Sequence, residues 1–251
     1  MVKIAIIGGS GLEKSNHIQS VSVKELSTKW GSPSSPITEG MLGNVPVAFL
    51  SRHGYDHSIP PTQVNNRANI AALKEIGCTH ILSSTAVGSL REEIHPGHLV
   101  IPDQFIDFTK RRVCTYYDDF KDGIHHVSLA DPFDEILRQD LIQICKKLHF
   151  EHHTKATVVT IEGPRFSTRA ESHMFRILGA DIINMSIAPE AILAAELGIP
   201  YATIAMSTDY DAWRQNVEPV SWEEILAVMD KNTQKVQQVF AEVVSLIAAH
   251  A

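Results

Sequence analysis

The sequence predicts a single α/β domain, residues 1–251, in which a mixed β-sheet is flanked by helices. The composition is 44% hydrophobic and 20% charged, and 251 residues are enough to bury a large core. Short β-branched runs alternate with helix-length segments, which is typical of α/β folds. No Pro-, Gly- or Ser-rich stretch of linker length divides the chain, so we expect one domain.

Short runs rich in β-branched residues, several of them ending at glycine or polar residues, predict the strands. They lie at residues 2–7, 45–50, 80–84, 154–161, 181–185 and 201–206. In open α/β sheets, ligands bind at the carboxyl ends of the strands. We therefore expect the functional residues to follow these runs directly.

Capping and glycine signals mark the predicted helices. A helix over 68–76 ends at Gly77, and Thr168 with Glu171 forms a capping box that opens a helix to about residue 178. Pro189 suits the first position of a helix that ends at about residue 197. A second capping box, at residues 221–224, opens a long helix with one apolar face, formed by Ile225, Leu226, Met229, Val236, Phe240 and Val243.

Charge and cysteine usage exclude several classes of partner. The net charge is −7, and Lys and Arg are scattered apart from residues 110–112, so nucleic acid is not expected to bind. The apolar start is only as long as a strand, which argues against a signal peptide or membrane span. Three cysteines without C-x-x-C spacing favour a reducing compartment, and we expect a cytoplasmic protein.

Four segments that follow predicted strands carry groups suited to an anion. Residues 8–11 read GGSG, where glycines let the backbone approach a phosphate and Ser10 offers a hydroxyl. Arg52 supplies a planar fork that matches phosphate oxygens. Hydroxyl and backbone donors at Thr85, Ala86 and Ser186 follow two further strands. Each segment alone is also compatible with an ordinary turn, but together they predict a phosphate site.

Asp209 and Asp211 follow the strand predicted at residues 201–206. If the strand continues, both side chains lie on one face, where one carboxylate accepts from a purine 6-amino group. The other, if protonated, donates to N7 as the glycosidic bond breaks, which requires a raised pKa. A solvated turn and a D-x-D metal site are the alternatives, and no further acidic residue has a spacing that completes a metal site.

Taken together, these segments resemble the trimeric purine nucleoside phosphorylase family, and within it the members that cleave 5′-methylthioadenosine. The likeness covers nearly the whole chain. It is carried by IIGGSGL at residues 6–12, by SRHG at 51–54, and by the segments 65–77, 89–94, 103–107, 160–167, 169–172, 183–185 and 205–213.

The resemblance implies a role for each matching position. Phosphate would be bound by Ser10, Arg52, His53, Thr85, Ala86 and Ser186. The nucleoside would be bound by Phe166, Ser167, Met185, His126 and Trp222, with Asp209 and Asp211 acting on the purine. The implied reaction is phosphorolysis of 5′-methylthioadenosine to adenine and 5-methylthioribose 1-phosphate, in purine and methionine salvage. It would be catalysed by a homotrimer without a metal or organic cofactor, with phosphate as co-substrate.

The departures from the family pattern affect specificity more than chemistry. Ser10 and Ser186 stand where Thr is common, and both keep the hydroxyl. Trp222 stands where a smaller aliphatic residue is familiar, so the preferred 5′ substituent stays open. The alternative is a phosphorylase with broader or different specificity, for adenosine, inosine or methylthioinosine. A metal-dependent nucleoside hydrolase and a nucleotide-binding sensor are further alternatives, and the histidines at 125, 126, 149, 152 and 153 are read as solvated rather than as metal ligands.

Overall fold

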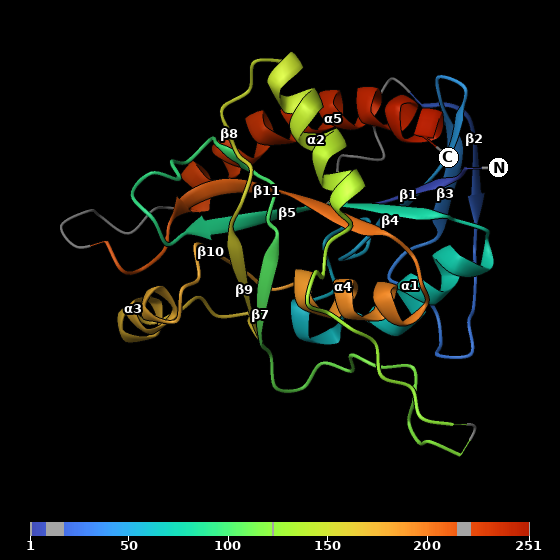
Figure 1. Ribbon diagram of the computed structural model, residues 1–251, viewed down its shortest axis with the longest axis horizontal. Helices are drawn as coiled ribbons and strands as arrows, with labels where there is room; N and C mark the ends of the chain where they lie inside the picture. Colours follow the sequence, from blue (N-terminus) through green and yellow to red (C-terminus); the bar gives the residue numbers. More distant parts are fainter. Residues whose placement is uncertain (1, 9–17, 122, 215–221, 251) are drawn as a thin grey trace.

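A mixed β-sheet with helices on both faces forms the protein, as the sequence predicts (Figure 1). The computed structural model describes residues 2–8, 18–121, 123–214 and 222–250, with the backbone alone at residues 18, 20 and 222–227. Within these residues, eleven strands belong to one sheet.

The sheet branches at the central strand β5, which pairs with β1, β10 and β11. Its main path runs in the order β2-β3-β4-β1-β5-β10-β9-β7, and β11 pairs with β5 while β6 links β11 to β8. The strands are β1 (Ile4–Gly8), β2 (Ile18–Lys24), β3 (Ile37–Leu42), β4 (Val45–Ser51), β5 (His80–Ser89), β6 (Leu99–Val100), β7 (Gln104–Phe108), β8 (His152–His153), β9 (Thr157–Ile161), β10 (Ile182–Asn184) and β11 (Tyr201–Tyr210). Because β4, β1, β5 and β11 run parallel, their carboxyl ends meet at one edge.

Helices cover the two faces of the sheet in pairs (Figure 1). The helices are α1 (Asn66–Glu75), α2 (Glu135–Lys147), α3 (Arg169–Ile177), α4 (Ile187–Glu196) and α5 (Trp222–His250), with a short 3₁₀ helix, η2 (Pro61–Gln63). α2 and α5 lie on one face, α1 and α4 lie on the other, and α3 lies beside β10 and β9.

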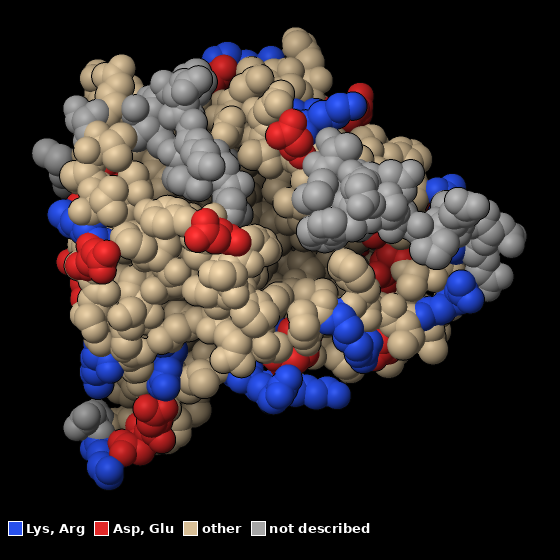
Figure 2. Space-filling view, turned by 180° about the vertical axis from the view of Figure 1, so that it is seen from behind, with Lys and Arg blue, Asp and Glu red and all other residues tan. Residues whose placement is uncertain are grey.

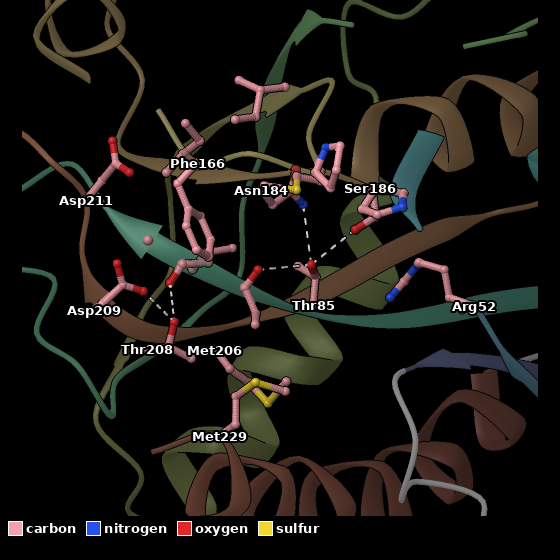
Figure 3. Close-up of a pocket in the computed structure, with 18 of the residues that line it drawn as sticks. Arg52, Thr85, Phe166, Asn184, Ser186, Met206, Thr208, Asp209, Asp211 and Met229 are labelled. Atoms are coloured by element: carbon pink, nitrogen blue, oxygen red, sulfur yellow. Dashed lines mark hydrogen bonds between the residues drawn. The ribbon is translucent and has the colours of Figure 1, made fainter. Parts of the chain in front are cut away.

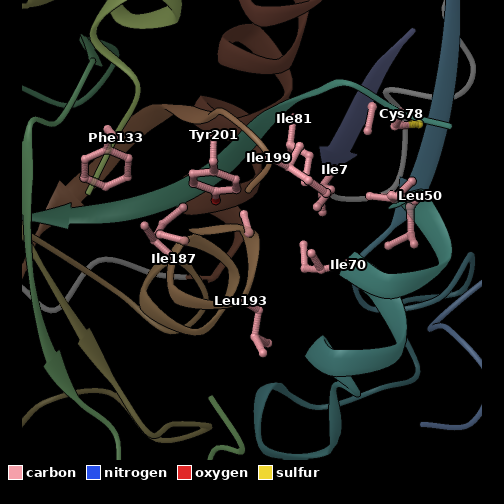
Figure 4. Close-up of a cluster of buried hydrophobic side chains, with 14 of the residues drawn as sticks. Ile7, Leu50, Ile70, Cys78, Ile81, Phe133, Ile187, Leu193, Ile199 and Tyr201 are labelled. Carbon is pink, nitrogen blue, oxygen red and sulfur yellow. The ribbon is translucent and has the colours of Figure 1, made fainter. Parts of the chain in front are cut away.

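Two apolar clusters hold these layers together. On the α1 and α4 side, Ile70 and Leu193 pack against sheet residues such as Ile7 and Ile81, all with 0% exposure (Figure 4). On the other side, the α5 residues Val236, Phe240 and Val243 are buried against the sheet and α2, which confirms that part of the predicted apolar face. Burial of this surface supplies the main stabilisation of the fold.

Some element boundaries differ from the prediction, and the differences matter for the site. β5 continues through residues 85–89 and β11 through residues 207–210, because each finds strand partners along this stretch. α4 begins at Ile187, so Pro189 is its third residue rather than its first, and Ser186 is the N-cap. The capping box of Thr168 and Glu171 is confirmed. The capping box predicted at residues 221–224 includes Ser221, which lies outside the described residues.

The structure also contains elements that the sequence analysis did not predict: β2, β3, β6, β7, β8, η2 and α2. Within the described residues, no helix is long and apolar enough to cross a bilayer. On the face in Figure 2, Lys and Arg are dispersed among Asp and Glu and form no single basic patch.

Candidate active site

A cavity of about 330 Å³ lies where the carboxyl ends of β4, β5 and β11 meet the segments after β9 and β10 (Figure 3). It brings together residues that the sequence analysis placed on separate strand ends. The predicted site residues that line it are Arg52, His53, Thr85, Ala86, Phe166, Ser167, Met185, Ser186, Asp209 and Asp211.

Three predicted site residues are not brought to this cavity by the described structure. Ser10 and the side chain of Trp222 lie outside the described residues. His126 is exposed, and its ring contacts Phe120 instead of lining the cavity. The role that the resemblance implies for His126 is therefore not seen within one chain.

Asp209 and Asp211 lie together at one end of the cavity, beside Gly88 of β5 (Figure 3). A methyl group added at Gly88 would lie 3.3 Å from Asp211 Cβ and 3.4 Å from Asp209 Oδ2, so glycine permits this close approach. The pairing of β11 with β5 shifts register between Ser207 and Asp209. The strand predicted at residues 201–206 continues to Tyr210, with an irregularity at Thr208, and Asp211 follows its last residue, so simple alternation does not by itself place the two aspartates on one face.

Burial, with a smaller contribution from the neighbouring carboxylate of Asp211, raises the pKa of Asp209 to about 6 against the opposing effect of the Thr208 hydrogen bond. Thr208 Oγ1 lies 2.7 Å from Asp209 Oδ1. Burial also raises the pKa of Asp211, although contacts with the Ser172 hydroxyl and the Ala212 N–H lower it. This end of the cavity therefore holds two carboxyl groups that bind protons more readily than ordinary aspartates.

The segment after β9 supplies the next wall of the cavity. It carries Phe166, whose side chain is 65% exposed, and Ser167, whose buried hydroxyl has no hydrogen-bond partner among the described residues. Gly163 has φ +66°, and a methyl group added there would lie 2.4 Å from Met185 Sδ. Glycine at this position thus leaves the space that Met185 fills.

Hydroxyl groups gather at the other end of the cavity. Thr85 Oγ1 lies 3.2 Å from Ser186 Oγ, and the amide of Asn184 donates to Thr85 Oγ1 at 3.5 Å (Figure 3). Thr160 Oγ1 donates to Asn184 Oδ1 at 2.8 Å, which fixes the orientation of that amide. Ser186 is also the N-cap residue of α4, where its side chain makes no capping hydrogen bond and the helix dipole favours an anion.

Arg52 extends along this hydroxyl end, and its guanidinium is held from the side by buried groups. Its side chain is 3% exposed and forms a buried ion pair with Glu190 of α4. Burial opposes the charge on Arg52 but the adjacent Glu190 carboxylate favours it, and the pKa of Arg52 is raised overall. The sequence analysis predicted Arg52 here but not its partner.

His53 is neutral in this environment. Burial and the charge of Arg52 lower the pKa of His53 to about 4. Its Nδ1 lies 2.9 Å from the carbonyl oxygen of Ile59, which can only accept, so Nδ1 carries the proton. The remaining ring nitrogen of neutral His53 is then a hydrogen-bond acceptor and not a cationic donor.

Comparison with known proteins identifies the family of this chain. The family model described as the phosphorylase superfamily matches residues 3–245. The chain belongs to the phosphorylase superfamily.

Relatives with similar sequences agree with this assignment. An S-methyl-5′-thioadenosine phosphorylase from Aedes aegypti is 51% identical over 250 residues, which cover 98% of this chain and 90% of the relative. One from Xenopus tropicalis is 49% identical over 99% of this chain and 90% of its own length. The family resemblance predicted from the sequence is confirmed.

Solved structures of the superfamily share the fold as well. A methylthioadenosine phosphorylase from Schistosoma mansoni, in complex with adenine, superimposes with a TM-score of 0.93 at 41% identity, covering 99% of this chain and 93% of that one. A methylthioadenosine phosphorylase from an antarctic soil metagenomic library gives a TM-score of 0.94 at 46% identity, covering 99% and 87%. The predicted mixed sheet with flanking helices is confirmed.

The sequence analysis did not predict several residues that line or support this cavity. They are His57, Asn184, Met206, Thr208, Glu190 and Met229. Glu190 carried a signal, because it is the one charged residue within the otherwise apolar start of α4, and such a residue needs a buried partner. Met206 and Met229 had been assigned only to a strand and to an apolar helix face.

No group of three or more His, Cys, Asp or Glu side chains within the described part of the chain is arranged to hold a metal ion. Of the histidines read as solvated, His153 is instead partly buried, and its Nε2 lies 3.0 Å from Nδ1 of His98.

Proposed function

We propose that this chain cleaves 5′-methylthioadenosine with inorganic phosphate and releases adenine and 5-methylthioribose 1-phosphate. The observation that carries the proposal is the pair Asp209 and Asp211 at one end of the cavity, with the pKa of Asp209 raised to about 6, opposite the anion-binding groups at the other end. The named functions of the relatives and the adenine complex of the Schistosoma mansoni structure support it. The products suit purine and methionine salvage.

Phosphate is bound at the end formed by Arg52, Thr85 and Ser186, with Ser10 and the backbone of Ala86 as further donors. From there it attacks C1′ of the ribose while adenine leaves from the opposite face. Such a displacement passes through an oxocarbenium-like state, which the bound anion stabilises. Phosphate is a co-substrate, and no organic cofactor or metal takes part in this proposal.

The leaving base receives a proton or hydrogen bond at N7 from Asp209, because negative charge builds up on the purine as the bond breaks. Asp211 accepts from the 6-amino group, and Ser167 completes the polar contacts. Met185 contacts the ribose hydroxyls, and Phe166 packs near the base. An ionised aspartate repels a 6-carbonyl oxygen, so adenine is preferred to hypoxanthine and guanine.

Adenosine is the second candidate substrate. One structural neighbour from Schistosoma mansoni is an adenosine/methylthioadenosine phosphorylase, of which a variant was solved with methylthioadenosine. Trp222 of this chain, at the position expected to face the 5′ group, is larger than the aliphatic residue familiar there. A substrate that carries a small 5′-hydroxyl is thus a specific alternative.

A steady-state comparison tests both candidates. Rates with methylthioadenosine, adenosine, 2′-deoxyadenosine, inosine and methylthioinosine are measured with and without phosphate. We expect methylthioadenosine to be preferred and release of adenine to require phosphate. Preference for inosine would contradict the role of the two aspartates, and equal rates without phosphate would indicate a hydrolase.

We also infer a cytoplasmic homotrimer in which a neighbouring subunit supplies His126 to the 5′ side of the cavity. His126 is exposed, and the same segment exposes the large apolar side chains Val113, Phe120, Ile124 and Val127. Exposed apolar groups in one segment are typical of a surface that another chain covers. Light scattering measures the subunit number, and a monomer with full activity would contradict this assembly.

A further inference from the structure

The side chain of Arg52 has four described hydrogen bonds, all to buried groups. Its Nη1 donates to the carbonyl oxygen of Ser84 at 2.9 Å, and its Nη2 donates to Ser83 Oγ at 3.1 Å. Nε and Nη2 donate to the two carboxylate oxygens of Glu190, the second at 3.1 Å. Such a two-point contact fixes the plane of the guanidinium as well as its position.

Glu190 is itself held in place. Its side chain is 1% exposed, and the hydroxyl of Tyr201 donates to Glu190 Oε2 at 2.8 Å. Burial and the Glu190 carboxylate raise the pKa of Tyr201 well above its ordinary value, so the phenol keeps its proton and remains a donor. Both carboxylate oxygens of Glu190 therefore have defined partners.

Glu190 also lies on the helix that carries part of the hydroxyl end. Ser186, the N-cap of α4, lies 3.2 Å from Thr85 Oγ1, and Glu190 follows it by four residues, about one helical turn. One rigid helix end thus places the Ser186 hydroxyl and the group that orients Arg52 on the same side. Figure 3 shows Ser186 and Arg52 extending toward Thr85 from different elements.

We propose that Glu190 is a positioning residue that, held by Tyr201, orients the guanidinium of Arg52 for phosphate. This inference rests on the proposed phosphate end of the site. Glu190 does not itself contact phosphate, because its two oxygens are occupied by Arg52 and Tyr201.

The alternative role of Glu190 is to weaken the positive charge of Arg52, and the two roles predict opposite results. Replacing Glu190 by Gln leaves Arg52 charged but removes the carboxylate. If Glu190 only weakened the charge, Glu190→Gln would bind phosphate more tightly. If Glu190 orients Arg52, Glu190→Gln loses one of the two ionic hydrogen bonds, and phosphate binding weakens.

The experiment measures the KM for phosphate at saturating methylthioadenosine and the KM for the nucleoside at saturating phosphate. We expect Glu190→Gln to raise the phosphate KM about 10- to 100-fold, as loss of a hydrogen bond to a charged group does. Tyr201→Phe removes only the supporting hydroxyl and should raise it about 3- to 10-fold. The KM for the nucleoside should change less than about twofold, which a general loss of folding would not produce.

Tyr116→Phe is the matched control. Tyr116 is also buried, and its hydroxyl donates to the carbonyl oxygen of Arg67 at 3.0 Å, away from the cavity. We expect its phosphate KM to equal that of the wild type. If Glu190→Gln does not fold, the comparison of the phosphate KM of Tyr201→Phe with that of Tyr116→Phe tests the positioning role by itself.

The variant Arg52→Ala tests the proposed phosphate end separately from the positioning role of Glu190. An unchanged phosphate KM in Arg52→Ala would overturn the proposed phosphate end itself. A raised phosphate KM in Arg52→Ala, with an unchanged or lowered value in Glu190→Gln and Tyr201→Phe, would overturn only the positioning role of Glu190.

Discussion

Buried charge is stabilised differently at the two ends of the cavity. After their proposed ligands we call them the phosphate end, formed by Arg52, Thr85 and Ser186, and the base end, formed by Asp209 and Asp211. At the phosphate end, Arg52 is paired with Glu190, and the charge of each is matched by a buried partner. At the base end, Asp209 and Asp211 have no cation among their described partners, and burial raises the pKa of both carboxyl groups. The charge of Arg52 is therefore balanced before a ligand binds. The carboxyl groups at the base end are instead stabilised by protonation or by the substrate.

The largest effect is expected at the base end. Asp209→Asn should lower kcat for methylthioadenosine by about 10²–10⁴-fold, the usual contribution of a general acid. Asp140→Asn is the control, because Asp140 is another buried aspartate whose pKa burial raises, and it lies on α2 outside the cavity. A near wild-type rate for Asp209→Asn would remove Asp209 from the mechanism.

At the phosphate end, Thr85→Val removes a hydroxyl and keeps the shape of the side chain. We expect the phosphate KM to rise about 10- to 100-fold, the cost of losing one hydrogen bond to an anion. The KM for the nucleoside should stay close to that of the wild type. Thr28→Val, which removes a buried hydroxyl bonded to the Gly31 carbonyl outside the cavity, should change neither constant. Equal changes in both constants for Thr85→Val would indicate that the two ends are not separate.

The pH dependence of kcat/KM for the nucleoside, at saturating phosphate, distinguishes the ends further. The active form of Asp209 is protonated, so kcat/KM should fall about tenfold per pH unit as the pH rises above about 6. His53, with its pKa lowered to about 4, stays neutral over this range and does not produce the decline. Asp209→Asn should lose this dependence, and its persistence in that variant would assign it to another group.

The smallest effect concerns the stability of the free protein. The pKa of folded Asp209 lies above its ordinary value, so its contribution is favourable below about pH 4 and is lost as the pH rises through about 6. Asp209→Asn should therefore be more stable than the wild type by about 1–2 kcal/mol at pH 7.5, and this gain should vanish near pH 4. Denaturant unfolding at the two pH values measures it, and a variant less stable at pH 7.5 would contradict the account.

Much of this arrangement is predictable from local sequence. Arg52 and Asp209 lie at or near the ends of β4 and β11, and Thr85 lies within β5 directly after the run predicted at residues 80–84; parallel strands bring such positions together. The capping box at Thr168 depends only on residues three apart. These features follow from short-range spacing, so one sequence suffices to find them.

The remaining features depend on contacts between distant parts of the chain. Arg52 and Glu190 are 138 residues apart, and only the packing of α4 on the sheet makes them partners. The shift of register at Thr208 arises from pairing with β5 and has no signature within β11. α2 is a different case, since its N-cap Asp134 and its buried face of Leu137, Leu141 and Ile144 were present in the sequence and were overlooked.

Gly88 limits the space at the base end of the cavity. A methyl group there would lie 3.1 Å from Ile183 Cγ2 as well as against both aspartates. The space beside Gly88 is therefore slightly too small for a methyl group, and the backbone of β5 limits the width of the end proposed to bind the purine. An alanine at position 88 would require Ile183 or Asp211 to shift by a few tenths of an ångström, which changes the position of a neighbour without changing either aspartate chemically.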